Sequence, residues 1–197
     1  VAGACAMAMA NASSDTHDEF LHSAQEIKHA RPTAINLAWA VDRLLAKIDG
    51  ISDDSEILRI LRDEASSIAE EDAAMCDKMA EHGLELIPDG TRALTHCNTG
   101  VLVTYGIGTS FGVLRNARDK GKLRHVYACE ARPLGQGARL TMWELAKLQI
   151  PGTLLCDSAV GSLMKVGKVA LVILVAVRMA ANCDPANNLF TFQLALL

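Results

Sequence analysis

The sequence predicts an α/β protein: a helical N-terminal part followed by a Rossmann-like parallel sheet with helices on both faces. Two observations predict it. Up to residue 88 the apolar side chains recur at helical spacing, and after it short apolar runs alternate with helix-length segments. Strands that alternate with helices pair in parallel, because each crossover returns the chain to the same edge. We therefore expect two domains, a helical part at 1–88 and a Rossmann-like α/β part at 89–197.

The helical part is predicted from side chains that share one helix face. Ile57 and Leu61 recur four residues apart, and further apolar residues continue their stripe. Ahead of them, Asp53 and Glu56 have the spacing of a capping box, which marks a helix start. Gly83 is expected to end this helix, because glycine is the common residue just past a helix C-terminus.

The second part is predicted as a series of strands and crossover helices. Strands are expected at 93–95, 125–129, 153–156 and 169–177, and helices at 105–119, 136–148 and 158–165. The segment Val169–Val177 is nearly all β-branched or aliphatic, which is typical of a strand buried on both sides. Right-handed crossovers place the carboxyl ends of all strands on one edge, where ligands bind in open parallel sheets.

The segment Thr95–Gly100, with the sequence Thr-His-Cys-Asn-Thr-Gly, follows the first expected strand. Its Cys97 has two readings. It is either a small buried apolar residue, the usual role of a lone cysteine, or a thiol that carries a proton at a substrate carbon. His96 should point the other way along the strand and act as a packing or orienting residue.

Composition excludes several classes of function. The net charge of −4 gives no basic surface for nucleic acid. The longest uncharged apolar run, 169–177, is far shorter than the roughly 20 residues of a membrane span. The six cysteines lack the spacing of a metal site and are expected to be reduced thiols, which indicates the cytoplasm, or the nucleus in a eukaryote. The glycines at 106–112 lack the dinucleotide spacing, so no nicotinamide cofactor is expected. Both ends stop in mid-pattern, and we expect the chain to be truncated there.

Several motifs occur in the same order in one family. They are Thr95–Gly100, Glu130–Thr141, Asp157-Ser158 and Ala180–Asn182 with Asp184 and Asn187. On these motifs the chain resembles the methylthioribose-1-phosphate isomerase family, aldose–ketose isomerases of methionine salvage. That family is related to the regulatory subunits of the exchange factor for translation initiation factor two. The resemblance implies conversion of 5-methylthioribose 1-phosphate, a phosphorylated pentose, to 5-methylthioribulose 1-phosphate. It also implies a homodimer that needs neither a metal nor an organic cofactor.

The resemblance assigns roles to particular residues. It makes Cys97 catalytic and places Val177 at the position of the family's proton-donating aspartate. The positions that it implies for substrate binding are Ala2, Gly3, Ala4, Arg31, Gln136, Asn187 and Asn188. Arginine suits a sugar phosphate because its planar fork donates two parallel hydrogen bonds. Arg132 and Arg139 are expected to be structural.

The chain departs from the family pattern at three functional positions. Ala2 stands where the family has arginine, Val177 where it has aspartate and Asn188 where it has lysine. Valine cannot carry a proton, and losing an acid or base commonly costs about 100- to 10,000-fold in rate. Asp157 or Asp184 would then have to supply the proton. The alternatives are therefore an isomerase, a non-catalytic homologue that acts as a sugar-phosphate sensor or an assembly subunit like those regulatory subunits, and an incomplete or altered copy of an isomerase.

Overall fold

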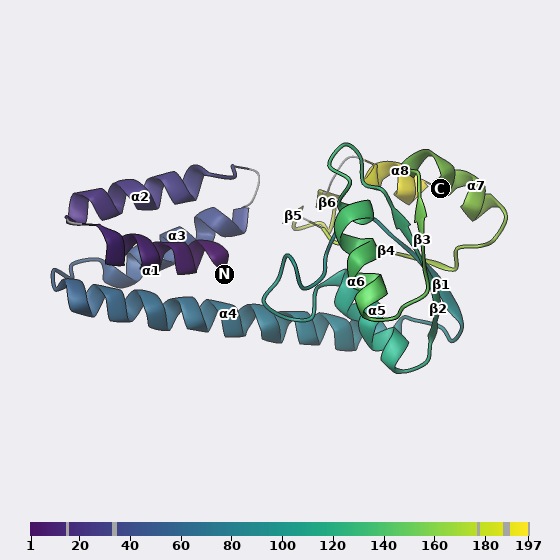
Figure 1. Cartoon of the computed structure of the whole chain (residues 1–197), viewed down its shortest axis with the longest axis horizontal. Coiled ribbons are helices and arrows are strands. Elements are labelled where there is room, and N and C mark those ends of the chain that lie inside the picture. Colours follow the sequence, from purple (N-terminus) through teal and green to yellow (C-terminus); the bar gives the residue numbers. More distant parts are fainter. Residues whose placement is uncertain (15, 33–34, 177, 187–189, 197) are drawn as a thin grey trace. The chain divides into compact units, whose positions relative to one another are not determined.

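The computed structural model describes residues 1–14, 16–32, 35–176, 178–186 and 190–196 (Figure 1). The chain forms two compact units, Val1–Asp72 and Ala73–Leu197. Their boundary falls inside the long helix α4, Asp54–Glu85. The division expected at 88/89 comes just after this helix ends, and as a division into domains it stays a prediction. Each unit is described below by itself.

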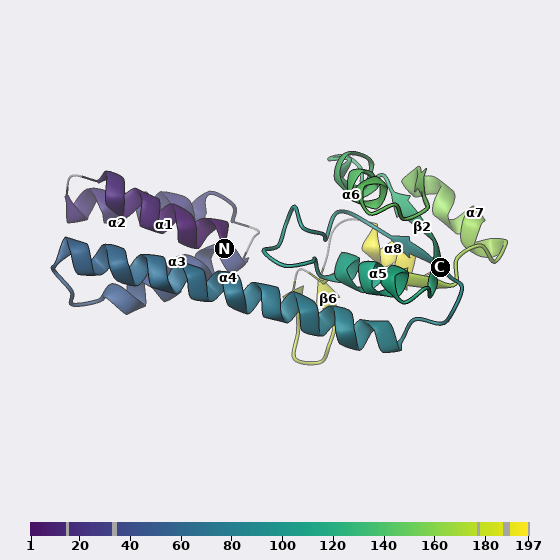
Figure 2. The same ribbon diagram turned by 60° about the horizontal axis from the view of Figure 1, so that its bottom comes forward.

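The first unit is a layer of helices. It consists of α1 (Ala2–Ser13), α2 (His17–His29), α3 (Ile35–Ile48) and the first part of α4 (Figure 2). All four helices contribute buried side chains to one core, among them Met7, Phe20, Leu44 and Leu61. Helix α2 begins with a capping box, because the Thr16 hydroxyl accepts the Glu19 N–H at 3.2 Å and the Glu19 carboxylate accepts the Thr16 N–H at 3.3 Å. Apolar helix faces therefore meet in a single interior, as the periodicity predicts.

An ion-pair network on Arg43 joins α3 to α4 within this unit. Its guanidinium donates to Glu64 at 2.6 Å and to both carboxylate oxygens of Glu71 at 2.6 and 2.7 Å. The hydrogen bonds from Arg43 lower the pKa of Glu71. Arg43 also lies over the ring of Trp39, 5.3 Å from its centroid. A two-oxygen match of this kind is the geometry in which arginine binds carboxylates best.

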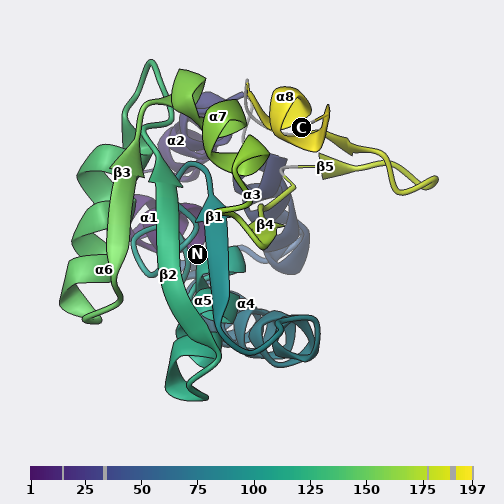
Figure 3. The ribbon, with the colours of Figure 1, turned by 90° about the vertical axis from the view of Figure 1, so that its right-hand side faces the viewer.

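The second unit is built on a four-stranded sheet. Its strands are β1 (Thr91–Thr95), β2 (Leu123–Cys129), β3 (Gly152–Leu155) and β4 (Leu171–Ile173), in the order β3-β2-β1-β4 (Figure 3). All three pairings are parallel. At the carboxyl edge, Thr95 lies opposite Ala128 of β2 and Ile173 of β4. The expected parallel sheet with its strand ends on one edge is confirmed.

Helices cover both faces of this sheet, so the predicted fold class is confirmed. The helices are α5 (Ser110–Asp119), α6 (Met142–Lys147), α7 (Val160–Lys165) and α8 (Thr191–Leu196), and the short elements are η1 (Gly137–Thr141), η2 (Asp157–Ala159), β5 (Arg178–Met179) and β6 (Pro185–Ala186). On β1, Ala93 packs against Phe111 of α5, whereas the next residue, Leu94, packs against Val160 of α7 and Leu194 of α8. Successive strand residues point to opposite faces, so each face receives its own helices.

The fourth strand differs from the expectation. Val169–Val177 was expected to form a strand buried on both sides, but β4 spans only Leu171–Ile173 and its side chains are half-buried. The reason lies in the strand order. Among the described strands, β4 lies at the edge of its sheet and pairs with β1 alone. Its β-branched and aliphatic composition is typical of a central strand, but an edge strand is less buried.

Two expected helix ends also differ. Gly83 does not end α4, which continues to Glu85. A β-carbon at Gly83 would lie 2.5 Å from a methyl of Val113 on α5, so this glycine permits close helix packing rather than a helix stop. The helix expected from 105 begins at Ser110, and the preceding loop carries exposed apolar side chains such as Val103 and Tyr105. In the described part of the chain, every helix is too short or too polar to cross a bilayer.

Candidate active site at the carboxyl edge of the sheet

Cys97 lies just past the carboxyl end of β1 in a left-handed backbone conformation, with φ 68°. Its side chain is partly exposed. A residue other than glycine rarely adopts such a φ, and where one does, the surrounding structure must hold it there. Strain of this kind concentrates at functional sites, so the backbone itself draws attention to the thiol.

The residues on either side of Cys97 fasten its loop to the fold. Before it, the Thr95 hydroxyl donates to the Ile173 carbonyl of β4 at 3.0 Å. After it, the Thr99 hydroxyl oxygen accepts the N–H of Phe111 at 3.1 Å and lies 2.7 Å from the Ser110 hydroxyl, at the first turn of α5. Thr99 therefore caps α5 from a distance and ties the loop to that helix.

A second fastening comes from η1 and α6. The Asn98 side-chain amide donates to Glu144 Oε1 at 2.8 Å and to the Thr141 hydroxyl at 3.3 Å. The Val101 N–H donates to Glu144 Oε2 at 3.0 Å. The Thr141 hydroxyl in turn donates to the Cys97 carbonyl. We call Asn98, Thr141 and Glu144 the loop clamp; all three are buried.

The clamp residue Thr141 lies at the end of a widened helical turn. Element η1 is a π-helix, in which the Met142 N–H bonds to the Gly137 carbonyl. Gly137 lies against the end of β2, where a β-carbon would be only 1.7 Å from the Cys129 carbonyl oxygen. Gln136, a predicted substrate ligand, immediately precedes this turn and is half-buried. The prediction that it binds substrate stays open.

Beneath the strand ends lies a cluster of His96, Cys129 and Asp157, whose potential ligand atoms are within 4.8 Å of one another. Among the described residues, this is the one group of three histidine, cysteine or acidic side chains close enough together to hold a metal ion. Burial and the nearby Asp157 raise the pKa of the Cys129 thiol to about 12. The two Asp157 oxygens accept the backbone N–H groups of Ala131 at 3.0 Å and Arg132 at 2.8 Å. Asp157 thus fixes the loop after β2, and that structural role competes with service as a substitute acid.

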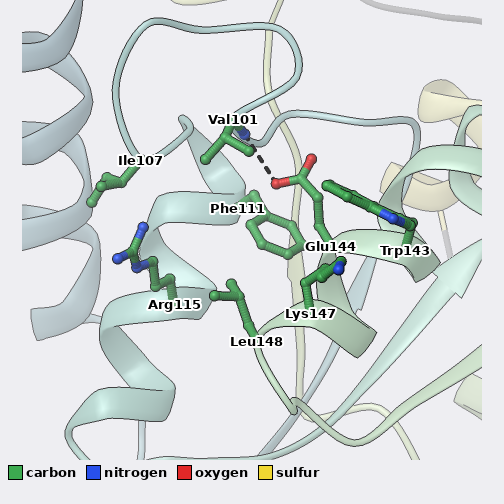
Figure 4. A pocket seen from close by; sticks show the side chains of 8 residues that line it. All are labelled: Val101, Ile107, Phe111, Arg115, Trp143, Glu144, Lys147 and Leu148. Atoms are coloured by element: carbon green, nitrogen blue, oxygen red, sulfur yellow. Dashed lines mark hydrogen bonds between the residues drawn. The ribbon is translucent and has the colours of Figure 1, made fainter.

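A pocket of about 210 Å³ lies beside the loop clamp, between the loop after Cys97 and helices α5 and α6 (Figure 4). Its lining is mostly apolar, with Phe111, Leu148 and Trp143 among its walls. Arg115 and Lys147 add positive charge, and the Glu144 side chain reaches the Val101 N–H from this side. The pocket and the clamp therefore share a wall.

The other predicted site residues fall in different places. Gly3 and Ala4 are buried in the first turn of α1, Ala2 is exposed beside them, and Arg31 is exposed just after α2. These four belong to the first unit, whereas Cys97 and Gln136 belong to the second, so their joint role as one site stays a prediction. Val177, Asn187 and Asn188 lie outside the described residues.

The expectations for His96 and Arg139 agree with the structure. The buried His96 ring lies 5.6 Å from the ring of Phe190, as expected for a packing residue. The Arg139 guanidinium donates to the Leu134 carbonyl at 2.8 and 3.1 Å, which is a structural role. The alternative acid Asp184 is exposed and accepts the Asn182 side-chain amide at 2.7 Å.

The sequence interpretation missed Glu144 and Thr141. One signal was available for Glu144. It lies four residues after Leu140 and four before Leu148, so a carboxylate occupies one apolar stripe of a helix. Acidic residues are almost never fully buried unless they are partnered, and this one is 2% exposed with two donors bound.

Together these features define a class: a Rossmann-like α/β protein with a strained, partly exposed thiol at the carboxyl edge of its sheet. The particular family follows from comparison. Residues 4–197 match the Initiation factor 2 subunit family, and the chain belongs to it.

Proteins named methylthioribose-1-phosphate isomerase are similar to most of this chain. The methylthioribose-1-phosphate isomerase of Gemmatimonas aurantiaca is 49% identical over 173 residues, covering 88% of this chain and 50% of that protein. The enzyme of the same name from Pelotomaculum thermopropionicum is 47% identical, covering 93% and 52%. The chain thus spans about half the length of the curated relatives it matches.

Two solved structures share the fold closely. The 5-methylthioribose 1-phosphate isomerase of Pyrococcus horikoshii OT3 has a TM-score of 0.89 and 34% identity, covering 99% of this chain and 57% of that one. The delta subunit of translation initiation factor eIF-2B from A. fulgidus has a TM-score of 0.81 and 38% identity, covering 99% and 59%. The resemblance recognised from the motifs is confirmed at the level of the family.

Proposed function

We propose that this chain carries the thiol side of a methylthioribose-1-phosphate isomerase site and takes part in converting 5-methylthioribose 1-phosphate to 5-methylthioribulose 1-phosphate. The observation that carries the proposal is Cys97, held at φ 68° at the carboxyl end of β1 by contacts from both sides. The substrate is inferred from the similarity of the chain to proteins named as this isomerase.

The reaction places definite demands on the site. Because the anomeric carbon carries the phosphate, the ring must open first: the C1–O4 bond breaks and O4 takes a proton. A proton then leaves C2, and its bonding electrons form a C1=C2 double bond. C1 takes up a proton while O2 loses its own to become the C2 ketone, so no electron leaves the sugar. Cys97 would act at the reacting carbons, while Gln136, Arg31 and Asn187 would hold the hydroxyl and phosphate groups.

The proposal predicts weak activity, because the resemblance places Val177 at the position of the family's proton donor. The test is to incubate the chain with 5-methylthioribose 1-phosphate and follow ketose 1-phosphate by phosphorus NMR. Val177→Asp should raise turnover by about 100-fold or more, the usual contribution of a positioned acid. Val166→Asp, at an exposed position after α7, is the matched control and should leave turnover unchanged. Cys97→Ser in the Val177→Asp background should remove the gain.

A second candidate function is a non-catalytic sugar-phosphate sensor or a regulatory subunit. The three departures from the isomerase pattern favour it, as does the similarity to the delta subunit from A. fulgidus. Binding of the substrate without turnover, in both the original chain and Val177→Asp, would support the sensor. Absence of binding in both would leave a structural subunit and refute the isomerase proposal.

We also propose that two copies associate and that neither nucleic acid nor a membrane is a partner. Met75 and Met79 support the dimer, because both are exposed on α4 at 53% and 43%. Large apolar side chains exposed together often mark protein contacts. Light scattering during size-exclusion chromatography would give the mass, and Met75→Lys combined with Met79→Lys should convert a dimer to monomers.

A further inference from the structure

We propose that Glu144, acting with Thr141, is a positioning residue that holds the Cys97 loop in its left-handed conformation and so sets the direction of the thiol. The inference about the conformation of the loop rests on the structure alone. Its consequence for turnover rests on the isomerase function proposed above. Neither residue contacts the reacting atoms in this proposal; both act through the peptide groups that flank Cys97.

The first support is how completely the Glu144 carboxylate is used. The residue is 2% exposed, and each oxygen accepts one hydrogen bond, from the Asn98 side chain at 2.8 Å and from the Val101 N–H at 3.0 Å. A buried carboxylate is costly and persists only where donors surround it. The donors here come from two residues of the same loop, one on each side of Gly100, so the carboxylate fixes the path of that loop.

The second support is that the loop is shaped around this carboxylate. A β-carbon at Gly100 would lie 2.0 Å from Glu144 Oε2, so only glycine lets the chain pass so closely. The Thr141 hydroxyl meanwhile accepts from Asn98 and donates to the Cys97 carbonyl. Thr141 thus holds the carbonyl of Cys97, and Thr141 and Glu144 together hold the side chain of the next residue, Asn98.

The third support is the strain at Cys97. With φ 68°, the backbone would relax toward a more common conformation if nothing held it. Relaxation would turn the side chain away from its present direction and free the loop. The clamp is the set of contacts that links this residue to η1 and α6, as Figure 4 shows for Glu144 and Val101.

A simpler interpretation is that Glu144 only stabilises the fold. The six cysteines of the chain distinguish the two interpretations, because they differ in exposure. Cys97 is intermediate, Cys76 and Cys129 are buried, and the other three are exposed: Cys5, Cys156 and Cys183. The alkylation rate of each can be followed in one sample by mass spectrometry after iodoacetamide treatment. Trypsin leaves Cys97 as the sole cysteine of the peptide Ala93–Arg115. The rates of Cys76 and Cys129 report opening of the whole unit, whereas that of Cys97 reports its loop.

The main variant is Glu144→Gln, which keeps the size of the side chain but replaces one acceptor with a donor. We expect the alkylation rate of Cys97 to rise several-fold while Cys76 and Cys129 stay protected. Thr141→Val should act in the same direction, and Thr141→Ser, which keeps the hydroxyl, should behave like the original chain. Glu81→Gln, at an exposed position on α4, is the matched control. An unchanged Cys97 rate, or a rise shared equally by Cys76 and Cys129, would overturn the proposal.

Turnover supplies a second and separable measurement. In a chain that converts the substrate, including Val177→Asp if that background is needed, Glu144→Gln should lower kcat by about 10- to 100-fold, as expected when a reacting group is slightly misplaced. KM should change little, because the residue touches no substrate. If the substrate is not turned over at all, the isomerase proposal fails, yet the alkylation rates still decide whether the clamp positions Cys97.

Discussion

Replacing Gly137 with alanine should test how the segment after β2 is held against the sheet. In an ordinary helix, glycine to alanine stabilises by about 1 kcal/mol. Here the new β-carbon would start 1.7 Å from the Cys129 carbonyl oxygen, whereas real contacts of this kind are essentially never closer than 3.0 Å. The oxygen that the β-carbon meets belongs to the backbone of β2, and the β-carbon is fixed to the backbone of η1, so η1 itself must move. Overpacking costs roughly 1–3 kcal/mol, and the upper end applies because no flexible side chain can yield.

The expected net change is therefore a loss of about 2 kcal/mol, opposite in sign to the propensity effect. Urea unfolding monitored by Trp143 fluorescence measures it, in a Trp39→Phe background that leaves Trp143 as the sole tryptophan. With a denaturant slope of about 2 kcal/mol per molar, the midpoint should fall by about 1 M.

Gly112→Ala on α5 is the matched control for this measurement. The atoms nearest to a β-carbon at Gly112 are side-chain atoms of Ile107 and Ala80, at 3.2 and 3.4 Å. The gain of about 1 kcal/mol in helix propensity offsets this slight crowding, so the midpoint should change little. If Gly137→Ala matches that control or stabilises the unit, then the close approach of η1 to β2 does not constrain the fold and the reasoning is wrong.

Three further predictions concern backbone strain and pH. Cys97→Val should have a free energy of unfolding about 1–2 kcal/mol lower than that of Cys97→Gly, because a β-branched residue tolerates φ 68° worst. Its urea midpoint should therefore be lower, and equal midpoints would contradict the strain. Arg43 holds the pKa of Glu71 below its usual 4.5, so this contribution to stability is present above that pH and lost as acid protonates the folded carboxylate. Arg43→Met should flatten the acid limb of a thermal-unfolding series. Cys129 keeps its proton in the fold up to pH about 12, so stability should fall as pH rises above 9.0, by at most about 1.4 kcal/mol per pH unit. Cys129→Ala should remove that slope in alkaline urea titrations.

The sequence specified the fold class well because the signals for it are local. Strand-length apolar runs separated by helix-length segments predict a parallel sheet, and the structure places helices on both faces. The extent of β4 was not predictable from composition. A run such as Val169–Val177 looks the same whether its strand has neighbours on one side or two, and only the strand order decides how much of it pairs.

The position of Cys97 just past a strand was predictable, but the hydrogen bonds that hold its loop were not. Cys97 stood out because it follows a strand in a polar loop. Its left-handed backbone did not, since the neighbouring Asn98 is the type that adopts such a φ more often. The clamp depends on hydrogen bonds between residues more than forty positions apart, as the Asn98–Glu144 separation of 46 shows. A π-turn also shifts the helical phase, so the periodicity that puts Glu144 in an apolar stripe cannot tell which residues of the fold that stripe meets.

The number of residues in η1 also determines how α6 is oriented relative to the ends of the neighbouring strands β1 and β2. An α-helix advances by about 100° per residue, so removing a single residue from 137–141 would rotate all of α6 by more than a quarter of a revolution. Gln136 would keep its place after β2, but Glu144 would swing away from the residues that follow β1. The two strand ends are thus coordinated by the residue count of one short segment, and a deletion there would uncouple them even if every side chain named above were retained.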